Sequence, residues 1–175
     1  MLESRGIIQN IEECKRRIEH IGGTFKHKYS FTDVIYLPKD RKIDLRTEFI
    51  RLRLYKDNGL PTKNIVLTHK ISHRHEGSKT DMLLVKKEFD GLDEAKAFID
   101  EHYDKNVNPA FKYFRKGWMY QAGNARVYIE EIEKFPLSVA IQADSESAIT
   151  DMFRALNVTK RISESVPEFM HRILK

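Results

Sequence analysis

The sequence contains a single cysteine, Cys14, among its 175 residues, and it has no long run of hydrophobic residues. One cysteine excludes an internal disulfide bond and any metal site built from several cysteines. A membrane-spanning helix needs about 20 consecutive apolar residues, and the first residues show no signal-peptide pattern. We therefore expect a protein without a membrane partner and, from its cysteine usage, a cytoplasmic setting.

The residues that are present are typical of a globular domain. Hydrophobic residues make up 41% of the chain and charged residues 33%. The length suits one domain over residues 1–175, with enough chain to bury a core. Lysine and arginine number 31 against 26 aspartates and glutamates, so the formal net charge is +5. This excess favours anionic partners such as nucleotides, polyphosphate or RNA, without choosing among them.

Residues 48–70 predict two neighbouring β-strands whose two faces differ. Side chains two residues apart on a strand point the same way, so Arg51 and Arg53 share one face and the aliphatic residues 50, 52 and 54 share the other. Lys70 lies on the polar face of the second strand. Like charges across strands are destabilising, so this pattern predicts an anion, and phosphate fits because arginine binds it bidentately. The alternative is an ordinary solvated strand face.

Periodicity and turn residues predict the other elements. Apolar residues recur at helical spacing after a candidate N-cap, Asn10, and again over 92–103, 145–156 and 167–174. Turns are expected at Asn58 with Gly59 and at residues 123–124. Residues 72–80 contain no apolar side chain and predict a mobile loop. About seven or eight strands with three or four helices predict an α+β fold whose antiparallel sheet curls into a barrel.

The polar strand faces would line the interior of this barrel. Collected across the strands, those faces carry six cations and four acids, namely Arg51, Arg53, Lys70, Lys86, Arg115 and Arg126 with Glu3, Glu88, Asp90 and Glu130. Burying so many like charges without partners would be prohibitive. A water-filled tunnel that is occupied by a polyanion resolves the difficulty.

Four blocks in this order resemble the CYTH superfamily, which includes class IV adenylate cyclases and thiamine, inorganic or RNA triphosphatases. The blocks are FIRLRL with Arg51 and Arg53, VLTHK with Thr68 and Lys70, KKEFD with Lys86, Glu88 and Asp90, and VYIEEIE with Glu130. The resemblance covers nearly the whole chain. It implies an eight-stranded antiparallel β-barrel, the triphosphate tunnel, with flanking helices.

The resemblance also implies roles for the polar residues. A nucleoside triphosphate or polyphosphate would be bound by the cations Arg5, Arg51, Arg53, Lys70, Lys86, Arg115 and Arg126. One or two Mg²⁺ or Mn²⁺ ions would be held by the acids Glu3, Glu88, Asp90 and Glu130.

The sequence departs from the family pattern at several inward positions. Met1 stands at the first acid of the family's Glu-x-Glu-x-Lys strand, and Gly117 stands at a family cation. The late Glu-x-Glu of the family falls on Ala140 and Gln142. Alanine offers no oxygen ligand and glutamine only a neutral carbonyl, so we expect a weakened metal site.

Three functions remain open from the sequence. The first is a metal-dependent enzyme acting on a triphosphate, with hydrolysis favoured over the cyclisation of a class IV adenylate cyclase. The second is a catalytically impaired nucleotide- or polyphosphate-binding module. The third is RNA binding, at a 5′ end or through aromatic residues of the strand 111–120, for which core packing is the alternative. The protein is expected to be a monomer or a homodimer.

Overall fold

A computed structural model gives the structure, and it describes residues 1–57, 63–75 and 77–174. The predicted turn at Asn58 and Gly59 lies outside these residues. The described strands are β1 (Leu2–Ile7), β2 (Thr24–Pro38), β3 (Glu48–Asp57), β4 (Ile65–His75), β5 (Ser78–Phe89), β6 (Val107–Ala122), β7 (Ala125–Ile132), β8 (Ser138–Ala143) and β9 (Lys160–Ile162). The described helices are α1 (Ile11–His20), α2 (Leu92–His102), α3 (Glu146–Ala155) and α4 (Val166–Ile173).

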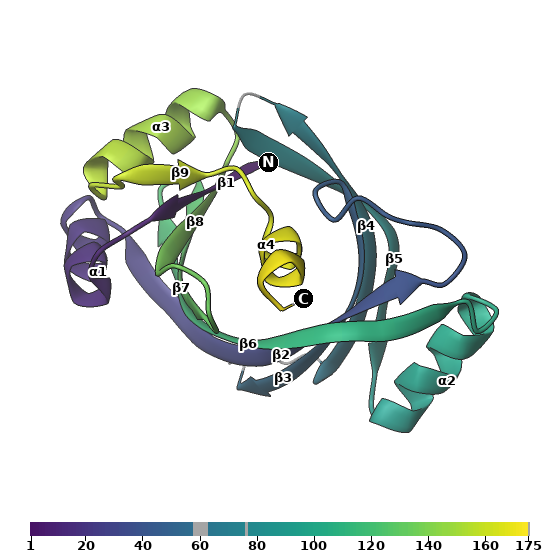
Figure 1. The fold of residues 1–175 in the computed structure, drawn as a ribbon. Coiled ribbons are helices and arrows are strands. Elements are labelled where there is room, and N and C mark those ends of the chain that lie inside the picture. Colours follow the sequence, from purple (N-terminus) through teal and green to yellow (C-terminus); the bar gives the residue numbers. More distant parts are fainter. Residues whose placement is uncertain (58–62, 76, 175) are drawn as a thin grey trace.

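The strands form one antiparallel sheet that closes into a ring (Figure 1). The strand order is β5-β4-β3-β2-β6-β7-β8-β1, and a further pairing of β5 with β1 joins the two ends through Glu3 and Lys79. The short strand β9 pairs with β1 as a ninth strand. The predicted closed antiparallel architecture with flanking helices is therefore confirmed, with β9 as an addition that the sequence did not predict.

Three helices cover the outside of the ring, where the aliphatic strand faces lie. α1 and α3 pack their buried Ile18 and Phe153 on β7 and β8, and α2 packs Ile99 on the outer faces of β3, β4 and β5 (Figure 1). The predicted N-cap of α1 is present, because the Asn10 side chain accepts a hydrogen bond of 2.9 Å from the Glu13 amide. Among the described residues, no helix has the length and apolarity needed to cross a membrane.

The prediction of a mobile loop over residues 72–80 is wrong for the described part of that segment. β4 continues to His75 and β5 begins at Ser78, and Arg74 pairs with Lys79 in the ladder. Gly77 has a φ of 91°, which suits a tight turn. Backbone hydrogen bonds between β4 and β5 hold this end of the hairpin without a buried hydrophobic face. The lack of apolar residues therefore did not indicate a loop.

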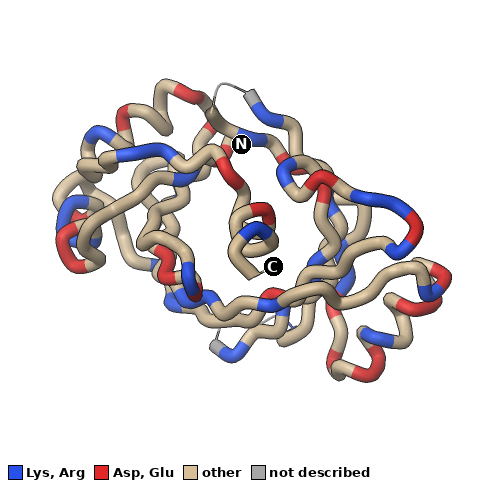
Figure 2. Tube along the Cα trace, in the orientation of Figure 1, with Lys and Arg blue, Asp and Glu red and all other residues tan. Residues whose placement is uncertain are grey.

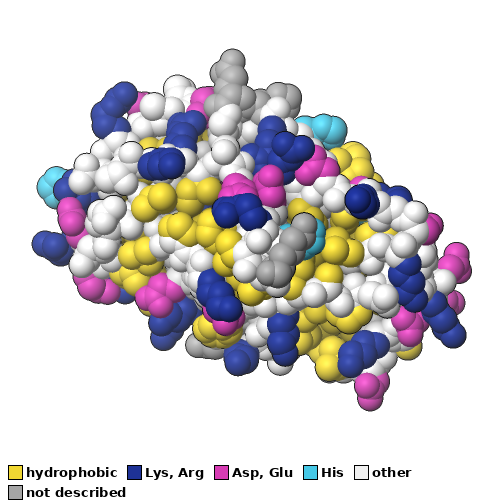
Figure 3. All heavy atoms as spheres, in the orientation of Figure 1, with side chains coloured by type: hydrophobic (Ala, Val, Ile, Leu, Met, Phe, Trp, Pro, Cys, Tyr) yellow, Lys and Arg dark blue, Asp and Glu magenta, His cyan; other side chains and the backbone are white. Residues whose placement is uncertain are grey.

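The fourth helix, α4, lies inside the ring (Figure 1). Val166, Phe169 and Met170 pack against the inward strand residues Ile35, Phe111, Tyr113 and Ile132 and against Phe135 of the connection between β7 and β8. Seen in the same orientation, side chains fill the space within the ring on this side (Figure 3). The helix thus acts as an apolar plug at one end of the tunnel.

The interior changes character along the strands. On β2 the inward residues run from aromatic Tyr29 and Phe31 through Asp33 to aliphatic Ile35, which contacts the plug. β7 repeats the order from Tyr128 through Glu130 to Ile132. The tunnel therefore has an aromatic end, a charged middle and an apolar end.

Candidate functional site

A cavity of about 380 Å³ occupies the charged and aromatic parts of the tunnel. Positions of both charge signs are distributed around the ring (Figure 2). The cavity wall comes from strands on all sides and from residues 162–167, which lead into α4. Most of its charged members belong to two groups, described in turn below, while Arg74 and Glu164 also line the cavity and contact Glu168 and Arg172 of α4.

The first group is the arginine cluster, which consists of Arg5, Asp33, Arg51, Arg53, Arg115 and Glu130. Its centre is Asp33, whose side chain is fully buried. Arg53 donates hydrogen bonds of 2.7 and 3.0 Å to the two Asp33 oxygens, and Arg115 lies 3.6 Å away. Burial alone would raise the pKa of Asp33, but Arg53 and Arg51 hold it well below the ordinary value.

Glu130 is the second acid of the arginine cluster. Its carboxylate lies 2.6 Å from Arg5 and 3.3 Å from Arg115, and it accepts a hydrogen bond of 2.7 Å from the Tyr29 hydroxyl. Burial opposes ionisation, yet Arg115 and Arg5 lower the pKa of Glu130 to about 2. Four arginines thus surround two carboxylates, which leaves a formal surplus of two positive charges.

The surplus charge coincides with hydrogen-bond donors that have no partner. The buried Nε atoms of Arg51 and Arg115 and the buried Tyr113 hydroxyl have no hydrogen-bond partner. Arg51 Nε lies 3.8 Å from Asp33, too far for a hydrogen bond. Burial and the neighbouring Arg53 lower the pKa of Arg51. Because unmet donors on buried cations are costly, this region is prepared for an anion that the protein itself does not supply.

The second group is the lysine cluster, which consists of Glu3, Lys70, Lys79 and Asp81. Lys70 contacts Asp81 at 2.5 Å, and Lys79 lies 3.2 Å from Glu3 and 3.7 Å from Asp81. Two cations therefore meet two carboxylates, and the charges balance. Burial, with Arg51 nearby, lowers the pKa of Lys70 to about 8. Burial opposes ionisation of Glu3, but Lys79 keeps the pKa of that carboxyl below its ordinary value.

The positions that depart from the family pattern lie on the cavity wall or beside it. Ala140 and Gln142 both line the cavity, and the Gln142 amide donates a hydrogen bond of 2.8 Å to Glu3. A Cβ atom on Gly117 would lie 2.5 Å from the Tyr29 ring and hydroxyl. The Tyr29 phenol therefore takes the space of a side chain at 117, and it meets Glu130 as a neutral donor in place of a cation.

The acids that face the cavity do not fit a divalent metal ion. Glu3 pairs with Gln142 and Glu130 pairs with Ser138, so the two acids lie four residues apart along β8, or about 13 Å at a rise of ~3.3 Å per residue. Each carboxylate already contacts a cation, and the Arg5 guanidinium bonds Glu130 and Ser138. Within the described residues, no group of three or more histidine, cysteine, aspartate or glutamate side chains is placed to hold a metal.

The structure brings seven of the predicted site residues to the cavity wall, namely Glu3, Arg5, Arg51, Arg53, Lys70, Arg115 and Glu130. It places four others outside the wall. Lys86 and Glu88 lie on β5 beyond a register shift between His69 and Lys70, and Asp90 follows β5 and contacts Lys63. Arg126 is exposed near the start of β7.

Three charged residues of the site were not predicted. Asp33 is the counter-ion of three arginines, and Lys79 and Asp81 complete the lysine cluster. The signal for Asp33 was the single acid of this strand, on the face that also carries Tyr29, Phe31 and Ile35. Lys79 fell in the segment 72–80 that the sequence predicted as a loop, and Asp81 directly follows that segment.

The aromatic strand that suggested RNA stacking is packed into the fold. Tyr113 is 1% exposed and contacts the plug, and Tyr120 is 3% exposed in the cluster under α1. Trp118 packs against that same cluster, and Lys15 of α1 lies over its ring. These rings are therefore not presented as a stacking platform.

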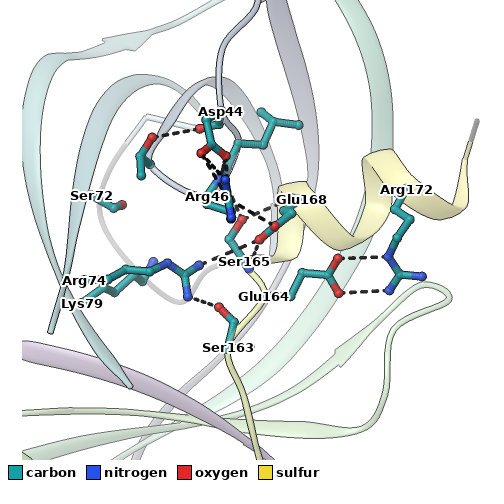
Figure 4. Close-up of polar contacts among 12 residues, drawn as sticks. Asp44, Arg46, Ser72, Arg74, Lys79, Ser163, Glu164, Ser165, Glu168 and Arg172 are labelled. Carbon is teal, nitrogen blue, oxygen red and sulfur yellow. Dashed lines mark hydrogen bonds and ion pairs between the residues drawn. The ribbon is translucent and has the colours of Figure 1, made fainter. Parts of the chain in front are cut away.

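A set of polar contacts fixes the segment that enters the plug (Figure 4). Ser165 caps α4 in a capping box with Glu168, and its hydroxyl donates a hydrogen bond of 2.7 Å to the Leu45 carbonyl. Arg46 lies 3.7 Å from Glu168, and Arg74 donates a hydrogen bond to the Ser163 carbonyl. These contacts attach the plug to β4 and to the connection between β2 and β3, which contains Leu45 and Arg46.

Neither protein-family models nor curated proteins give a match to this sequence. Solved structures do. A Pyrococcus horikoshii protein matches with a TM-score of 0.79 at 18% identity over 98% of both chains. A candidate adenylate cyclase of Vibrio parahaemolyticus matches with a TM-score of 0.68 at 11% identity over 97% of this chain and 96% of its own. A candidate adenylyl cyclase of Hippeastrum, described as having a dominant triphosphatase activity, matches with a TM-score of 0.68 at 11% identity over 99% and 96%.

The chain has the fold of the CYTH superfamily. At these identities the matches establish the fold, and the chemistry of this CYTH-fold protein has to be argued from its own residues.

Proposed function

We propose that this CYTH-fold protein binds a nucleotide or polyphosphate anion in its cavity, without a metal ion held by its own carboxylates. The observation that carries the proposal is the arginine cluster, where two surplus positive charges coincide with buried guanidinium donors that lack partners. Phosphate oxygens satisfy such donors well, because arginine offers a planar fork of N–H groups. Of the functions that the sequence left open, the arginine cluster favours the second, a catalytically impaired binding module, over the first, a metal-dependent enzyme.

The carboxylates available as metal ligands argue against hydrolysis that depends on a metal ion held by the protein. The family's late acid pair is Ala140 and Gln142, and the remaining acids already bind cations. Burial opposes ionisation of both Glu3 and Glu130, but neighbouring cations lower their pKa values overall, so these carboxylates are weak general bases near neutral pH. The arginines retain the capacity to hold phosphate oxygens. Mg²⁺ or Mn²⁺ as a cofactor is not part of this proposal.

The fold neighbours suggest the chemical class of ligand. The Vibrio and Hippeastrum proteins are candidate adenylate cyclases, and the second is described as a triphosphatase. These descriptions point to nucleoside triphosphates and related phosphates as the first compounds to test. RNA 5′ ends remain a predicted ligand, and a monomeric or homodimeric state remains a prediction.

The test measures binding and phosphate release together. Tripolyphosphate, pyrophosphate, AMP, ATP, GTP, thiamine triphosphate and 5′-triphosphate RNA would each be titrated with Mg²⁺, with Mn²⁺ and with a chelator. We expect at least one to bind in chelator, with no release of phosphate or cyclic nucleotide under any condition. Binding should weaken at least tenfold in Arg51→Met, which leaves the Arg53–Asp33 hydrogen bonds in place, and not in Arg154→Met, which changes an exposed arginine of α3.

Metal-dependent turnover that is lost in Arg51→Met would overturn the proposal and establish the enzyme. The absence of binding by every compound would also overturn it.

A further inference from the structure

We infer that the cavity selects a phosphate ligand that carries two negative charges and an aromatic ring, with the phosphate in the arginine cluster and the ring at the aromatic end. This inference rests on the proposed function and names the ligand class for the same site. It departs from the expectation that the site is built for a free triphosphate.

The first support is the charge count of the arginine cluster. Four guanidinium groups and two carboxylates are linked by contacts of 2.6 to 3.8 Å, and every member is at least 86% buried at its side chain. The neighbouring lysine cluster is balanced by its own acids and adds no surplus. Two further charged residues of the wall are also balanced, because Arg74 lies 4.0 Å from Glu168 and Glu164 lies 3.0 Å from Arg172. The cavity therefore offers an incoming anion a formal charge of +2.

The size of this surplus limits the charge of the ligand. Buried charge without compensation is costly in either sign. A phosphate monoester carries about −1.5 to −2 at pH 7 and neutralises the cluster. A metal-free nucleoside triphosphate carries about two further negative charges, because each added phosphoryl group ionises, and these would have to face Glu3 and Glu130 without cations of their own.

A triphosphate bound to its own Mg²⁺ ion also has a net charge near −2. It shares the charge of a monoester, and the metal would arrive with the ligand instead of being held by the protein. Both sources of a doubly charged phosphate therefore fit, and the experiment separates them.

The second support is the aromatic wall beside the arginines. Phe31 lies under the Arg53 guanidinium at 3.5 Å and stacks on Tyr29 with ring centroids 5.5 Å apart and planes at 7°. Tyr55 and Tyr128 complete this wall, and all four rings line the cavity. Phe31 and Tyr29 are 2% and 6% exposed and form the packed base of this wall, so the partly exposed rings of Tyr55 and Tyr128 offer the stacking surface for a base or another planar group.

The plug fixes the orientation of the ligand. α4 fills the opposite end with Val166, Phe169 and Met170, so the space beyond the arginines is apolar and closed. A ligand that places its phosphate on Arg51 therefore cannot extend past the plug, and we place its ring at the aromatic end of the cavity, against Tyr55 and Tyr128. The phosphate therefore enters first and the ring stays at the aromatic end.

The test is a calorimetric titration series at constant ionic strength and pH 7.5. Adenosine, ribose 5-phosphate, AMP, ADP and ATP would be titrated in chelator, and ATP also with Mg²⁺. We expect AMP to bind at least tenfold more tightly than ATP in chelator and at least tenfold more tightly than ribose 5-phosphate. Mg²⁺ should strengthen ATP binding at least tenfold, and adenosine should not bind measurably.

Two variants shift the charge of the cluster in opposite directions. Glu130→Gln raises the surplus to three and should lower the preference for AMP over ATP in chelator at least fivefold. Arg51→Met lowers the surplus to one and should weaken both ligands while keeping AMP preferred. Arg154→Met on α3 should leave the preference unchanged, and circular dichroism confirms folding of each variant.

Affinity that rises from AMP through ADP to ATP in chelator would overturn the inference while leaving the proposed phosphate binding intact. Equal binding of AMP and ribose 5-phosphate would overturn the aromatic part. If no phosphate compound binds, the proposed function fails together with the inference.

Discussion

The two charged clusters of the cavity are built from the same kinds of residues but differ in balance. In the lysine cluster each cation meets a carboxylate, and Lys70 has a pKa near 8, so this group can also lose its charge. In the arginine cluster the cations outnumber the acids and keep unmet donors. The number of basic residues on a wall therefore does not identify an anion site; the charge left after internal pairing does.

Removing the acid at the centre of the arginine cluster should have the largest effect on stability. Asp33→Asn leaves three buried arginines without their shared counter-ion, and we expect a loss of about 3–5 kcal/mol in the free energy of unfolding. Urea denaturation measures it. Asp81→Asn in the lysine cluster should cost clearly less, because Lys70 can become neutral; equal losses would contradict the difference between the clusters.

Restoring the family's acid pair should convert the balanced cluster into one that responds to metal. Ala140→Glu with Gln142→Glu places two carboxylates beside Glu3 on the cavity wall. Their mutual repulsion should lower the melting temperature in chelator, and Mn²⁺ should reverse the loss. The wild-type protein serves as the control and should show no shift with Mn²⁺. A double variant indifferent to metal would mean that these positions do not face a common site.

The two clusters should also affect the pH dependence of stability, each in its own pH window. Glu130 has a pKa of about 2 in the folded state against an ordinary 4.5, so the unfolded state binds more protons between these values. Its contribution to stability is present above pH 4.5 and is lost as the pH falls toward 2. Glu130→Gln should lack this component in acid denaturation curves.

Lys70 acts in an alkaline window, and there burial disfavours the charged form of the side chain. Its pKa is about 8 in the folded state against 10.5, so the unfolded state binds more protons between pH 8 and 10.5. Wild-type stability should therefore gain with rising pH over this window relative to Lys70→Met. A flat difference between the two proteins would show that Lys70 is not desolvated.

The smallest effect is expected for an exposed ion pair of the plug segment. Arg172 and Glu164 form a paired contact at 3.0 Å on the plug segment, and the Arg172 side chain is 60% exposed. Exposed pairs contribute about 0–1 kcal/mol, so Arg172→Ala should change the urea midpoint little. A loss as large as that of Asp33→Asn would mean that the plug, and not the charged middle, controls stability.

Strand alternation predicted much of this site. Arg51 and Arg53 face the cavity while Leu52 packs outside under α2, and Ala140 and Gln142 face inward as expected. These assignments succeed because a period of two is a local property of a strand.

Features of the site that depend on contacts between distant parts of the chain were not predicted. Lys86 and Glu88 follow the inward alternation in sequence, but the register shift opposite Lys70 and the length of β5 carry them past the cavity. The helix α4 was predicted, but its place inside the ring depends on an apolar inner end to which β2, β6 and β7 all contribute. Asp33 became a counter-ion only once β3 and β6 brought arginines to both sides of it.

The most direct measurement of the central claim is equilibrium unfolding in chelator with increasing AMP, for the wild-type protein beside Arg51→Met and Arg154→Met. If the arginine cluster holds an uncompensated surplus, wild-type stability should rise by about 1.4 kcal/mol for each tenfold increase in ligand above its Kd. Arg154→Met should follow the wild type, and Arg51→Met should not respond over the same range. A wild-type protein whose stability is independent of AMP, or a response that requires added metal, would contradict the account.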